Sequence, residues 1–453
     1  MNVTIQDISA AREHRAVRQR ELLDRCGGTL ISFTMNIAGP EKDSALIREG
    51  MRIGERLLEE RLKAEKIAVL LREKEQAFTG GTCYYLVDAD PARVKRITVD
   101  IEDESPAGRL YDMDVLAKDG KKTGRAELGL PDRQCLICGK RAQICARSRA
   151  HSLEELRQKT ADLLRDAAAK DRAVTIASSA CEAILDEVLT SPKPGLVDRF
   201  NNGSHRDMDT FTFASSTAAL YPYFYTCALT GAKTADESAK VTFEKIRKEG
   251  KLAEERMLQA TGGVNTHRGA IFSMGILCAA AGRIGRAEWS AARLRKECAD
   301  MAAGIVSSDF AEAEKREPLT YGERLYYECG VTGVRGEAEA GFPLVFETGY
   351  PRLLEGLAAG LSLNDAGCAA LLAIMAGNTD TNVIHRSSME SLRGLQERIR
   401  ALLKDNLYPA REELEKLDAE VTCRSISPGG SADLLAMCYM VRLLEKAGGP
   451  DVE

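Results

Sequence analysis

The first 120 residues alternate between short apolar runs and one longer charged run. Residues 29–39 (TLISFTMNIAG) and 82–90 (TCYYLVDAD) are apolar stretches of strand length. Between them, residues 44–66 (SALIREGMRIGERLLEERLKAEK) repeat apolar side chains at the three- and four-residue spacing of a helix. The pattern therefore predicts two strands separated by a helix.

Two further runs alternate between apolar and polar side chains. In residues 96–104 (RITVDIEDE), isoleucine and valine alternate with threonine and carboxylates, and residues 109–117 (RLYDMDVLA) alternate in the same way around Asp112 and Asp114. Because successive side chains of a strand point to opposite faces, each run is predicted to be a strand with one acidic face. The two strands are expected to pair across residues 104–109, which would gather carboxylates on one surface.

The period changes to that of helices from about residue 172 onward. Residues 175–189, 269–284, 360–377 and 431–449 repeat apolar, often small, side chains at three and four. In the last of these, Ser431 is the expected N-cap, and Gly448 and Gly449 are expected to end the helix. Residues 153–173 are charged and lack proline and glycine, which predicts a helical junction. We therefore expect an α+β domain over residues 1–165 and an all-α domain over residues 172–453.

Composition narrows the class of protein. The chain has 453 residues, 44% hydrophobic and 29% charged, with a net charge of -5. The length favours more than one domain, and the net charge argues against a dedicated nucleic-acid binder. The sequence contains no apolar run of membrane-spanning length and no signal-peptide core near its start, so a cytoplasmic protein is expected. The 13 cysteines are odd in number and scattered, which favours reduced thiols over a disulfide framework.

Five polar loops interrupt the helical half. Residues 191–209 (SPKPGLVDRFNNGSHRDMD) crowd charge between prolines and glycines, and four shorter segments share this character: GGVNTHRGAIF, GVRGEAEAGFP, GNTDTNVIHR and SISPGGSADLLA. Three of the five histidines in the chain, His205, His267 and His385, fall inside these loops. Glycines ahead of a helix start offer free N–H groups to an anion. Solvated loops and simple caps are the alternative reading of each segment alone, but the set suits a polyphosphate site with a metal ion.

In this order, the five motifs resemble those of triphosphoribosyl-dephospho-CoA synthase, over roughly residues 172 to 447. The resemblance implies that ATP and 3'-dephospho-CoA are joined through the 2'-hydroxyl of the CoA ribose, with release of adenine. Ser387 and Ser388 stand where the family usually carries glycines, so any backbone contact that needs glycine there is in doubt. Such chemistry needs an acid for adenine and a base for the hydroxyl.

The resemblance also implies candidate site residues. The catalytic candidates are Asp198, Asp207, Asp209, Glu337, Glu339 and Asp380, with Asp207 and Asp209 proposed to hold Mg²⁺. The division of labour among these acids is left open. The candidates for binding substrate and phosphate are Lys193, Arg199, His205, Asn265, His267, Arg268, Arg335, Asn382, Arg386, Gly429, Gly430 and Ser431.

Residues 135–151 (CLICGKRAQICARSRAH) contain a cysteine-rich cluster. Cys135, Cys138, Cys145 and His151 form a set sufficient for tetrahedral zinc. The alternative is a basic loop with reduced thiols, in which Arg141, Arg147 and Arg149 contact phosphate. The sequence favours the thiol reading, because the spacing between the second and third cysteines fits no zinc finger.

The N-terminal half also resembles a known family. SFTMNIAGPEKDS, GRLYDMDVL, CLICGKRAQICARSRAHSLEEL and REHRAVRQ are similar to phosphoribosyl-dephospho-CoA transferase, which builds the holo acyl carrier protein of citrate lyase, over about residues 5 to 165. The resemblance implies a nucleotidyltransferase-like domain that moves the precursor to a carrier serine and releases pyrophosphate. Asp112 and Asp114 are the candidates for catalysis and for holding Mg²⁺. The phosphate clamp is expected from Lys42, Arg109 and Arg147.

The two resemblances support each other, because the product of the second half is the substrate of the first. They predict a bifunctional citrate lyase maturation enzyme that uses ATP, 3'-dephospho-CoA and the apo acyl carrier protein (the gamma subunit), with Mg²⁺ and without nucleic acid or membrane. Two alternatives stay open: the similar synthase of the malonate decarboxylase pathway, and a non-enzymatic adaptor that carries zinc and binds a carrier protein.

Overall fold

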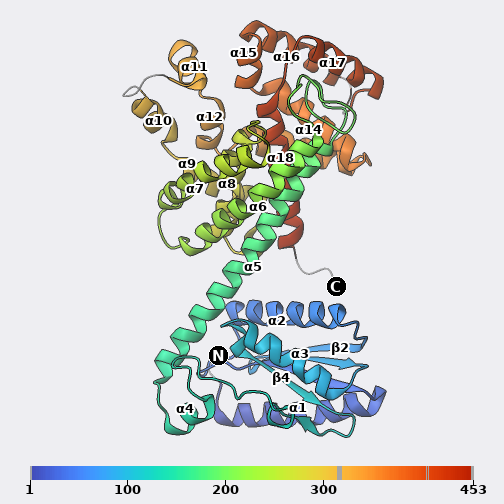
Figure 1. Ribbon diagram of the computed structural model, residues 1–453, viewed down its shortest axis with the longest axis vertical. Helices are drawn as coiled ribbons and strands as arrows, with labels where there is room; N and C mark the ends of the chain where they lie inside the picture. The colour runs from blue at the N-terminus through green and yellow to red at the C-terminus, as the bar shows by residue number, and fades with distance from the viewer. Residues whose placement is uncertain (1–2, 314–318, 405, 407, 450–453) are drawn as a thin grey trace. The chain divides into compact units, whose positions relative to one another are not determined.

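The computed structural model describes residues 3–313, 319–404, 406 and 408–449 (Figure 1). The chain divides into two compact units, residues 1–171 and 172–453. Helix α5 (Leu153–Leu189) contributes residues to both units, so the junction is helical, as its composition predicts. Within the described residues, no helix is both long and apolar enough to cross a membrane.

The first unit is built on one antiparallel sheet of five strands. The strand order is β2-β3-β1-β4-β5. The elements before α5 are α1 (Ile5–Cys26), β1 (Thr29–Met35), α2 (Ala45–Ala64), β2 (Val69–Ala77), β3 (Gly80–Val87), α3 (Pro91–Glu104), η1 (Gly108–Leu110), β4 (Tyr111–Leu116), β5 (Lys122–Thr123), η2 (Ala126–Leu128) and α4 (Ala142–Ser148).

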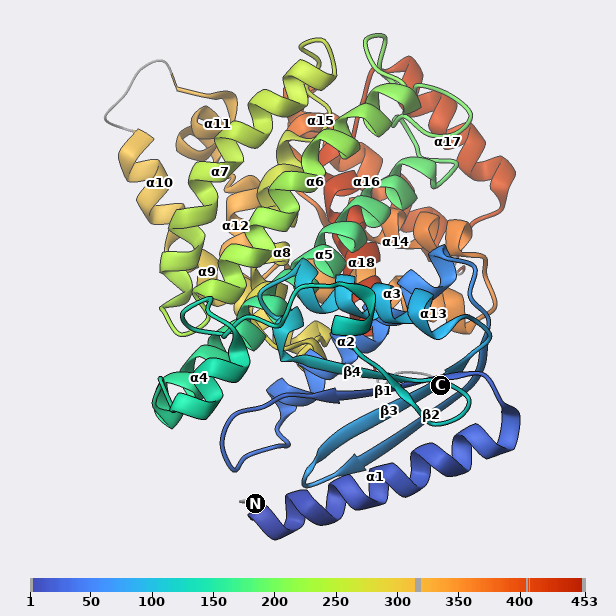
Figure 2. The same ribbon diagram turned by 60° about the horizontal axis from the view of Figure 1, so that its bottom comes forward.

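Helices cover both faces of this sheet (Figure 2). On one face, α2 and α3 pack apolar side chains such as Leu58 and Ile101 onto Phe33 and Met113. On the other face, Leu22 of α1 packs among apolar side chains of β1 and β3. The predicted strands at 29–39, 82–90 and 109–117 and the predicted helix at 44–66 are confirmed.

The strand predicted at residues 96–104 is wrong, because this segment is the C-terminal part of α3. Asp90 caps the helix by accepting hydrogen bonds from the backbone N–H of Ala92 and Arg93, and Pro91 occupies the first helical position. The apolar residues of α3 face the sheet at helical spacing, with Ile97 and Ile101 buried four residues apart. The alternation that suggested a strand is therefore incidental, and the predicted pairing across residues 104–109 does not exist.

Side chains of α3 and of Arg133, rather than the backbone of a neighbouring strand, satisfy the backbone groups of Tyr111 and Met113 at the edge of β4. Glu102 of α3 accepts a hydrogen bond from the Met113 N–H at 3.0 Å, and Lys95 donates to the Met113 carbonyl at 2.9 Å. Arg133 donates to the Tyr111 carbonyl and pairs with Glu102 at 2.9 Å. Strand β4 instead pairs with β1, where Asp112 lies opposite Thr34 and Asp114 lies opposite Ser32. The two aspartates therefore share one face of the sheet.

The second unit is mostly helical, and its described residues contain no strand. Besides the end of α5, its elements are α6 (Thr210–Lys233), α7 (Ala239–Ala260), α8 (Arg268–Arg283), η3 (Arg286–Glu288), α9 (Ala291–Ala302), α10 (Ile305–Ala313), α11 (Tyr321–Cys329), α12 (Gly333–Glu339), the π-helix η4 (Leu344–Gly349), α13 (Tyr350–Ala358), α14 (Leu363–Gly377), α15 (Thr381–Arg386), α16 (Met389–Leu403), α17 (Arg411–Cys423) and α18 (Gly429–Gly448).

Helices α8, α14 and α18 form the centre of this unit, and most of their residues are buried. Small side chains allow this packing: a Cβ on Gly231 of α6 would meet the backbone carbonyl of Ala279 of α8 at 2.1 Å. The four predicted helices are confirmed, and Gly449 caps α18 as expected. The prediction that Ser431 is an N-cap is wrong. Helix α18 begins two residues earlier, at Gly429, because Pro428 precedes it.

Candidate functional sites

The second unit contains a cavity of about 790 Å³ lined by several of the polar loops. Its wall includes residues of the 191–209 loop, the first turns of α8 and α18, and parts of α7 and α12. Ten of the predicted binding residues line it: Lys193, His205, Asn265, His267, Arg268, Arg335, Asn382, Arg386, Gly429 and Gly430. Segments almost 240 residues apart in the chain therefore meet at one cavity.

Positive charge dominates the polar part of this cavity. Six cationic side chains and four carboxyl groups line it: Lys193, Arg247, Lys251, Arg268, Arg335 and Arg386, with Glu187, Glu254, Asp309 and Asp433. Three of the carboxylates hold cations in place. Asp309 binds Arg247 through two hydrogen bonds of 2.6 and 2.7 Å and Arg335 through one of 2.8 Å. The site therefore presents oriented guanidinium groups, which suit the bidentate binding of phosphate.

Two helix starts add to this positive potential. The N-terminal residues of α8 (Arg268 and Gly269) and of α18 (Gly429 and Gly430) line the cavity. The first turn of a helix carries N–H groups without intrahelical partners and the positive end of the helix dipole. Together with the cations, these helix starts form a site for a polyanion. Aromatic and aliphatic side chains, among them Phe213, Tyr223 and Phe243, line the rest of the cavity and can pack against a base.

His267 is buried at the start of α8. Its Nδ1 lies 2.6 Å from the Ser216 hydroxyl, and Ser216 in turn accepts a hydrogen bond from Thr266. Burial, together with the charge of Lys193, lowers the pKa of His267 to about 3. His267 is thus neutral, and its Nε2 is buried without a hydrogen-bond partner among the described residues.

Asp433 is one of the four acidic residues of the cavity, none of which was among the site candidates from the sequence. It lies in the second turn of α18, and its Oδ2 would be 1.9 Å from a Cβ on Gly269. Burial, followed by the negative charges of Glu187 and Asp380, raises the pKa of Asp433 well above its usual value. This environment favours the protonated form of the carboxyl group, which can act as a general acid.

Hydrogen bonds to the carboxylates of Asp198 and Glu187 hold the loop at residues 191–209 in place. Asp198 is buried and accepts hydrogen bonds from the backbone N–H of Lys193, Phe200 and Asn201. Lys193 donates to the carbonyl and the carboxylate of Glu187. Arg199 donates to Asn364 at 2.8 Å and lies outside the cavity lining. Asp198 and Arg199 therefore support the loop, and Lys193 carries its charge toward the cavity.

The remaining predicted acids lie outside the cavity lining, and most of them accept hydrogen bonds from the backbone. Asp209 caps α6, and Asp207 lies 3.9 Å from His205 with its side chain 62% exposed. Glu339 accepts from the N–H groups of Gly304 and Val306, and Glu337 accepts from Leu344, with its pKa raised by burial. Asp380 is buried, accepts from the backbone and hydroxyl of Ser431, and has a pKa raised by burial. None of these five acids, nor Ser431, is among the described residues that line the cavity.

The first unit has its own cavity, of about 460 Å³, between α1 and the sheet. Asp112 and Lys42 line it, together with Arg12, His14 and Arg15 of α1. Burial, followed by the positive charge of the nearby Arg12, lowers the pKa of Lys42. The group of cationic side chains that lines this cavity favours the binding of an anion.

Asp112 and Asp114 differ in their surroundings although they share a sheet face. Asp112 faces the cavity, and burial, with the adjacent charge of Asp114, raises its pKa. Asp114 forms an ion pair with Lys122 at 2.6 Å and is not among the described residues that line the cavity. Arg109 lines a separate hollow with Lys159, and Arg147 is exposed on α4. Of the predicted phosphate clamp, only Lys42 therefore lies in the cavity of Asp112.

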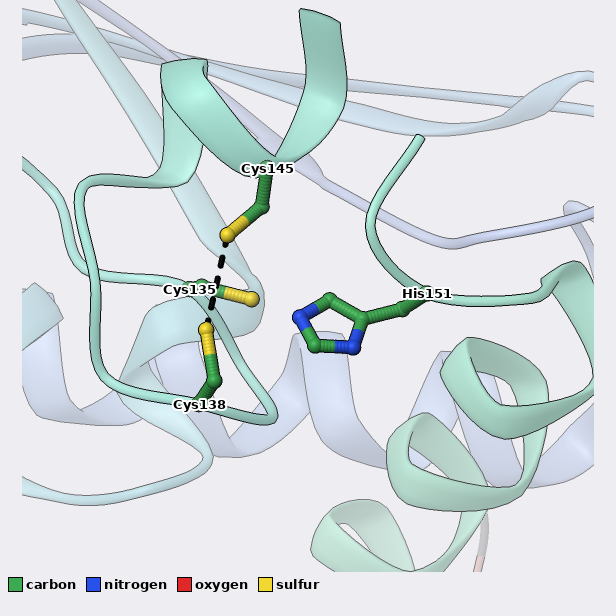
Figure 3. A group of neighbouring side chains, drawn as sticks. All are labelled: Cys135, Cys138, Cys145 and His151. Atoms are coloured by element: carbon green, nitrogen blue, oxygen red, sulfur yellow. Dashed lines mark hydrogen bonds between the residues drawn. The ribbon is translucent and has the colours of Figure 1, made fainter. Parts of the chain in front are cut away.

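The structure also brings together Cys135, Cys138, Cys145 and His151 (Figure 3). One ligand atom from each side chain lies within 4.8 Å of those of the other three.

Sequence reasoning missed Glu187, Arg247, Lys251, Glu254 and Asp309, which line the larger cavity. They lie within ordinary amphipathic helices, where a charged residue resembles a solvated one until the fold is known. In the first unit, the cluster REHRAVRQ carried the signal for Arg12 and Arg15, because its arginines lie close to a histidine, but the sequence assigned no role to them.

Comparison with known proteins identifies both units. A family model described as ATP:dephospho-CoA triphosphoribosyl transferase matches residues 173–451. A second, described as apo-citrate lyase phosphoribosyl-dephospho-CoA transferase, matches residues 3–167. The chain is therefore a transferase with two catalytic units, and both resemblances seen in the sequence are confirmed.

Full-length relatives have the same arrangement. The chain is 34% identical to Protein CitXG of Haemophilus influenzae, over 96% of the chain and 95% of that protein. It is 32% identical to Protein CitXG of Leuconostoc mesenteroides subsp. cremoris, over 96% of both. It is also 41% identical, over 57% of the chain and 85% of the relative, to 2-(5''-triphosphoribosyl)-3'-dephosphocoenzyme-A synthase of Pectobacterium atrosepticum. The chain belongs to the CitXG family, which joins the two steps of citrate lyase maturation.

Proposed function

We propose that the cavity of the second unit joins ATP to 3'-dephospho-CoA and releases adenine, with Asp433 as the acid. The observation that carries this assignment is a half-buried carboxyl group with a raised pKa in the lining of a cation-rich pocket with two helix starts. The triphosphate would lie against these helix starts and the arginines, and adenine would lie against the aromatic wall. This arrangement leaves the ribose between the phosphates and the base, within reach of the acid.

The proposed step breaks the bond between the ribose anomeric carbon and adenine and forms a bond from that carbon to the CoA 2'-hydroxyl oxygen. Asp433 gives its proton to the departing adenine. Glu187 lines the same cavity, ion-pairs with Lys193, and is close enough for its charge to raise the pKa of Asp433. We assign Glu187 to accept the hydroxyl proton, because it lines the same cavity as Asp433 and its carboxylate is held in place by Lys193.

For the first unit, we propose transfer of the phosphoribosyl-dephospho-CoA group to a serine of the apo acyl carrier protein of citrate lyase, with pyrophosphate as the leaving group. Lys42, Arg12 and Arg15 would bind the triphosphate, and Asp112 would act beside it. A nucleotidyltransferase-like fold and a cytoplasmic location remain predictions from the sequence. The match of residues 3–167 favours the citrate lyase pathway over that of malonate decarboxylase and over an adaptor.

Mg²⁺ is proposed as the companion of the nucleotide. In the first unit, the carboxylate of Asp112 lies in the cavity and would hold a hard cation, which would neutralise phosphate charge when bound. Asp114 lies on the same sheet face, but its carboxylate is paired with Lys122. In the second unit, the predicted pair Asp207 and Asp209 is less suited to hold Mg²⁺, because the carboxylate of Asp209 already caps helix α6 by accepting from the Thr212 N–H. We therefore assign no step of adenine release to a metal ion.

Adenine is the product that tests the assignment of the second unit. Purified chain incubated with ATP, Mg²⁺ and 3'-dephospho-CoA should release adenine, measured by chromatography, in equal amount to a product heavier by one triphosphoribosyl group. Cleavage at the anomeric carbon frees the base, whereas a kinase would release ADP. Formation of ADP, or adenine release that does not depend on dephospho-CoA, would contradict the proposal.

Gly269→Ala is expected to slow adenine release by about 10²-fold, because the added methyl group overlaps the Asp433 carboxyl and displaces it. The matched control is Gly394→Ala on α16, where a Cβ meets nothing within 4 Å. This control should keep full activity and gain about 0.5–1 kcal/mol of stability. Initial rates of adenine release for the two purified variants make the comparison. Equal rates would show that the position of Asp433 is unimportant.

A further inference from the structure

Residues 135–140 (CLICGK) form a tight turn that presents two thiols on one side. The backbone N–H of Cys135 donates to the Lys140 carbonyl at 2.6 Å, and the N–H of Ile137 points to the Cys135 sulfur at 3.5 Å. Gly139, with φ of +71°, provides the left-handed residue that this turn requires. The turn brings the sulfur atoms of Cys135 and Cys138 within 4.8 Å of each other.

The third and fourth side chains come from the segment that follows. A bridge between Gln134 and Arg141 leads directly into α4, whose first turn places Cys145 over the turn formed by CLICGK. The N–H of Ala150 donates to the Cys145 carbonyl at 3.1 Å, and this closes the chain back toward His151. The long spacing between Cys138 and Cys145 is therefore spanned by the entry into a helix, and their sulfur atoms lie 3.4 Å apart.

The imidazole of His151 gives separate support for a metal ion at this cluster. Its Nε2 is buried and has no hydrogen-bond partner among the described residues. Figure 3 shows the imidazole pointing a ring nitrogen toward the three sulfur atoms. A buried ring nitrogen without a partner costs free energy, because it has lost its hydrogen bonds to water. A metal ion among the sulfur atoms would provide that partner.

We propose that Cys135, Cys138, Cys145 and His151 bind one Zn²⁺ ion. Three sulfur ligands and one imidazole are a closed tetrahedral set, which is typical of structural rather than catalytic zinc. Zinc–sulfur bonds of about 2.3 Å place tetrahedral sulfur ligands about 3.8 Å apart. The sulfur atoms of Cys138 and Cys145 are 3.4 Å apart and no two ligand atoms of the cluster are more than 4.8 Å apart, so only small shifts would give this geometry. Lys140, Arg141, Arg147 and Arg149 lie in the same segment and would offset the net negative charge of a zinc ion with three thiolates.

The role of the ion follows from the position of the cluster. The segment from 129 to 152 contains one short helix, α4, and its main apolar anchor is Leu136, which packs against the cluster of Ile37, Ile47, Leu110 and Leu164. Metal binding would hold this segment against the sheet unit and fix the start of α5 two residues after His151. This role does not depend on the proposed reactions.

Metal analysis of the full chain tests the proposal. Protein purified without chelator from zinc-containing medium should contain about one equivalent of zinc by elemental analysis. Replacement by Co²⁺ should give the intense visible absorption of tetrahedral cobalt together with sulfur-to-metal charge transfer. Protein free of zinc and lacking the cobalt spectrum would overturn the proposal. A disulfide between Cys138 and Cys145, found by mass spectrometry of unreduced protein, would also overturn it.

Single-residue variants distinguish the loss of a metal ligand from a general folding defect. Cys138→Ser should lose the ion, whereas His151→Cys should keep it, because four thiolates also bind zinc tetrahedrally. The matched control is Cys329→Ser, which removes another exposed cysteine, on α11, and should keep the ion. Hydrogen exchange should accelerate in residues 129–152 of Cys138→Ser and of chelator-treated protein, but not in Cys329→Ser. Equal zinc content in Cys138→Ser and the unmodified chain would contradict the assignment of these ligands.

Discussion

Asp433→Asn should slow adenine release by about 10²–10⁴, because asparagine keeps the size of the side chain but has no acidic proton to give. The binding of ATP should change little, since the cationic residues and helix starts of the cavity remain. Initial rates over a range of ATP concentrations separate the two effects. A fall in kcat with a nearly constant KM is the expected result.

The pH profile gives a second signature of the same residue. The pKa of Asp433 is raised, and the acid acts only while protonated, so the rate should fall as the pH rises through that pKa. Asp433→Asn should lack this alkaline limb. A carboxyl group whose pKa is higher in the folded than in the unfolded chain stabilises the fold at low pH, and that contribution is lost as the pH rises. At neutral pH the variant should therefore unfold at the same or a higher temperature.

The control for Asp433→Asn lies in the other unit of the same protein. The variant should still transfer a supplied precursor to the carrier protein at the normal rate. Full adenine release by Asp433→Asn would show that another acid protonates the base, and loss of both activities would indicate a general folding defect.

Asp112→Asn should lower transfer to the carrier protein by at least about 10²-fold while adenine release continues unchanged. Asp112 faces the cavity that contains Lys42, Arg12 and Arg15, and removal of its charge leaves this anion site without its acidic partner. The measurement is the rate at which the carrier protein gains mass when the precursor is supplied directly.

Asp114→Asn is the matched comparison. Asp114 is on the same strand face but pairs with Lys122, and it is not among the described residues of the cavity lining. Its replacement should therefore reduce transfer less than that of Asp112. Equal losses would show that both carboxylates act together, for example on one metal ion, and survival of transfer in Asp112→Asn would remove this aspartate from the site.

The sequence motifs of the second unit indicated which loops lie at its cavity. They did not show which acids face the cavity and which only bind the backbone around it. His267, Arg268 and Gly430 line one cavity, because each of their motifs lies at the start of a helix whose first turn faces that cavity. Asp380 and Asp209 belong to equally polar motifs, yet their carboxylates are occupied by backbone N–H groups. Whether a carboxylate caps a helix or faces a substrate depends on tertiary geometry, which spacing does not encode.

The error in the first unit has a local origin. Residues 96–104 alternate like a strand, but Asp90 and Pro91 form a helix start six residues upstream, and this signal outweighs the alternation. Helix α1 and strand β2 were not predicted, because both are rich in charged residues and only one face of α1 contacts the sheet. The pairing of Asp112 with Thr34 likewise depends on which strands become neighbours.

The most direct test of a two-step enzyme is the intact mass of the apo acyl carrier protein after incubation with this chain, ATP, Mg²⁺ and 3'-dephospho-CoA. Our account predicts one phosphoribosyl-dephospho-CoA group on each carrier protein and one adenine released for each group attached. A carrier protein that stays unmodified while adenine accumulates, or one that is modified without release of adenine, would contradict it.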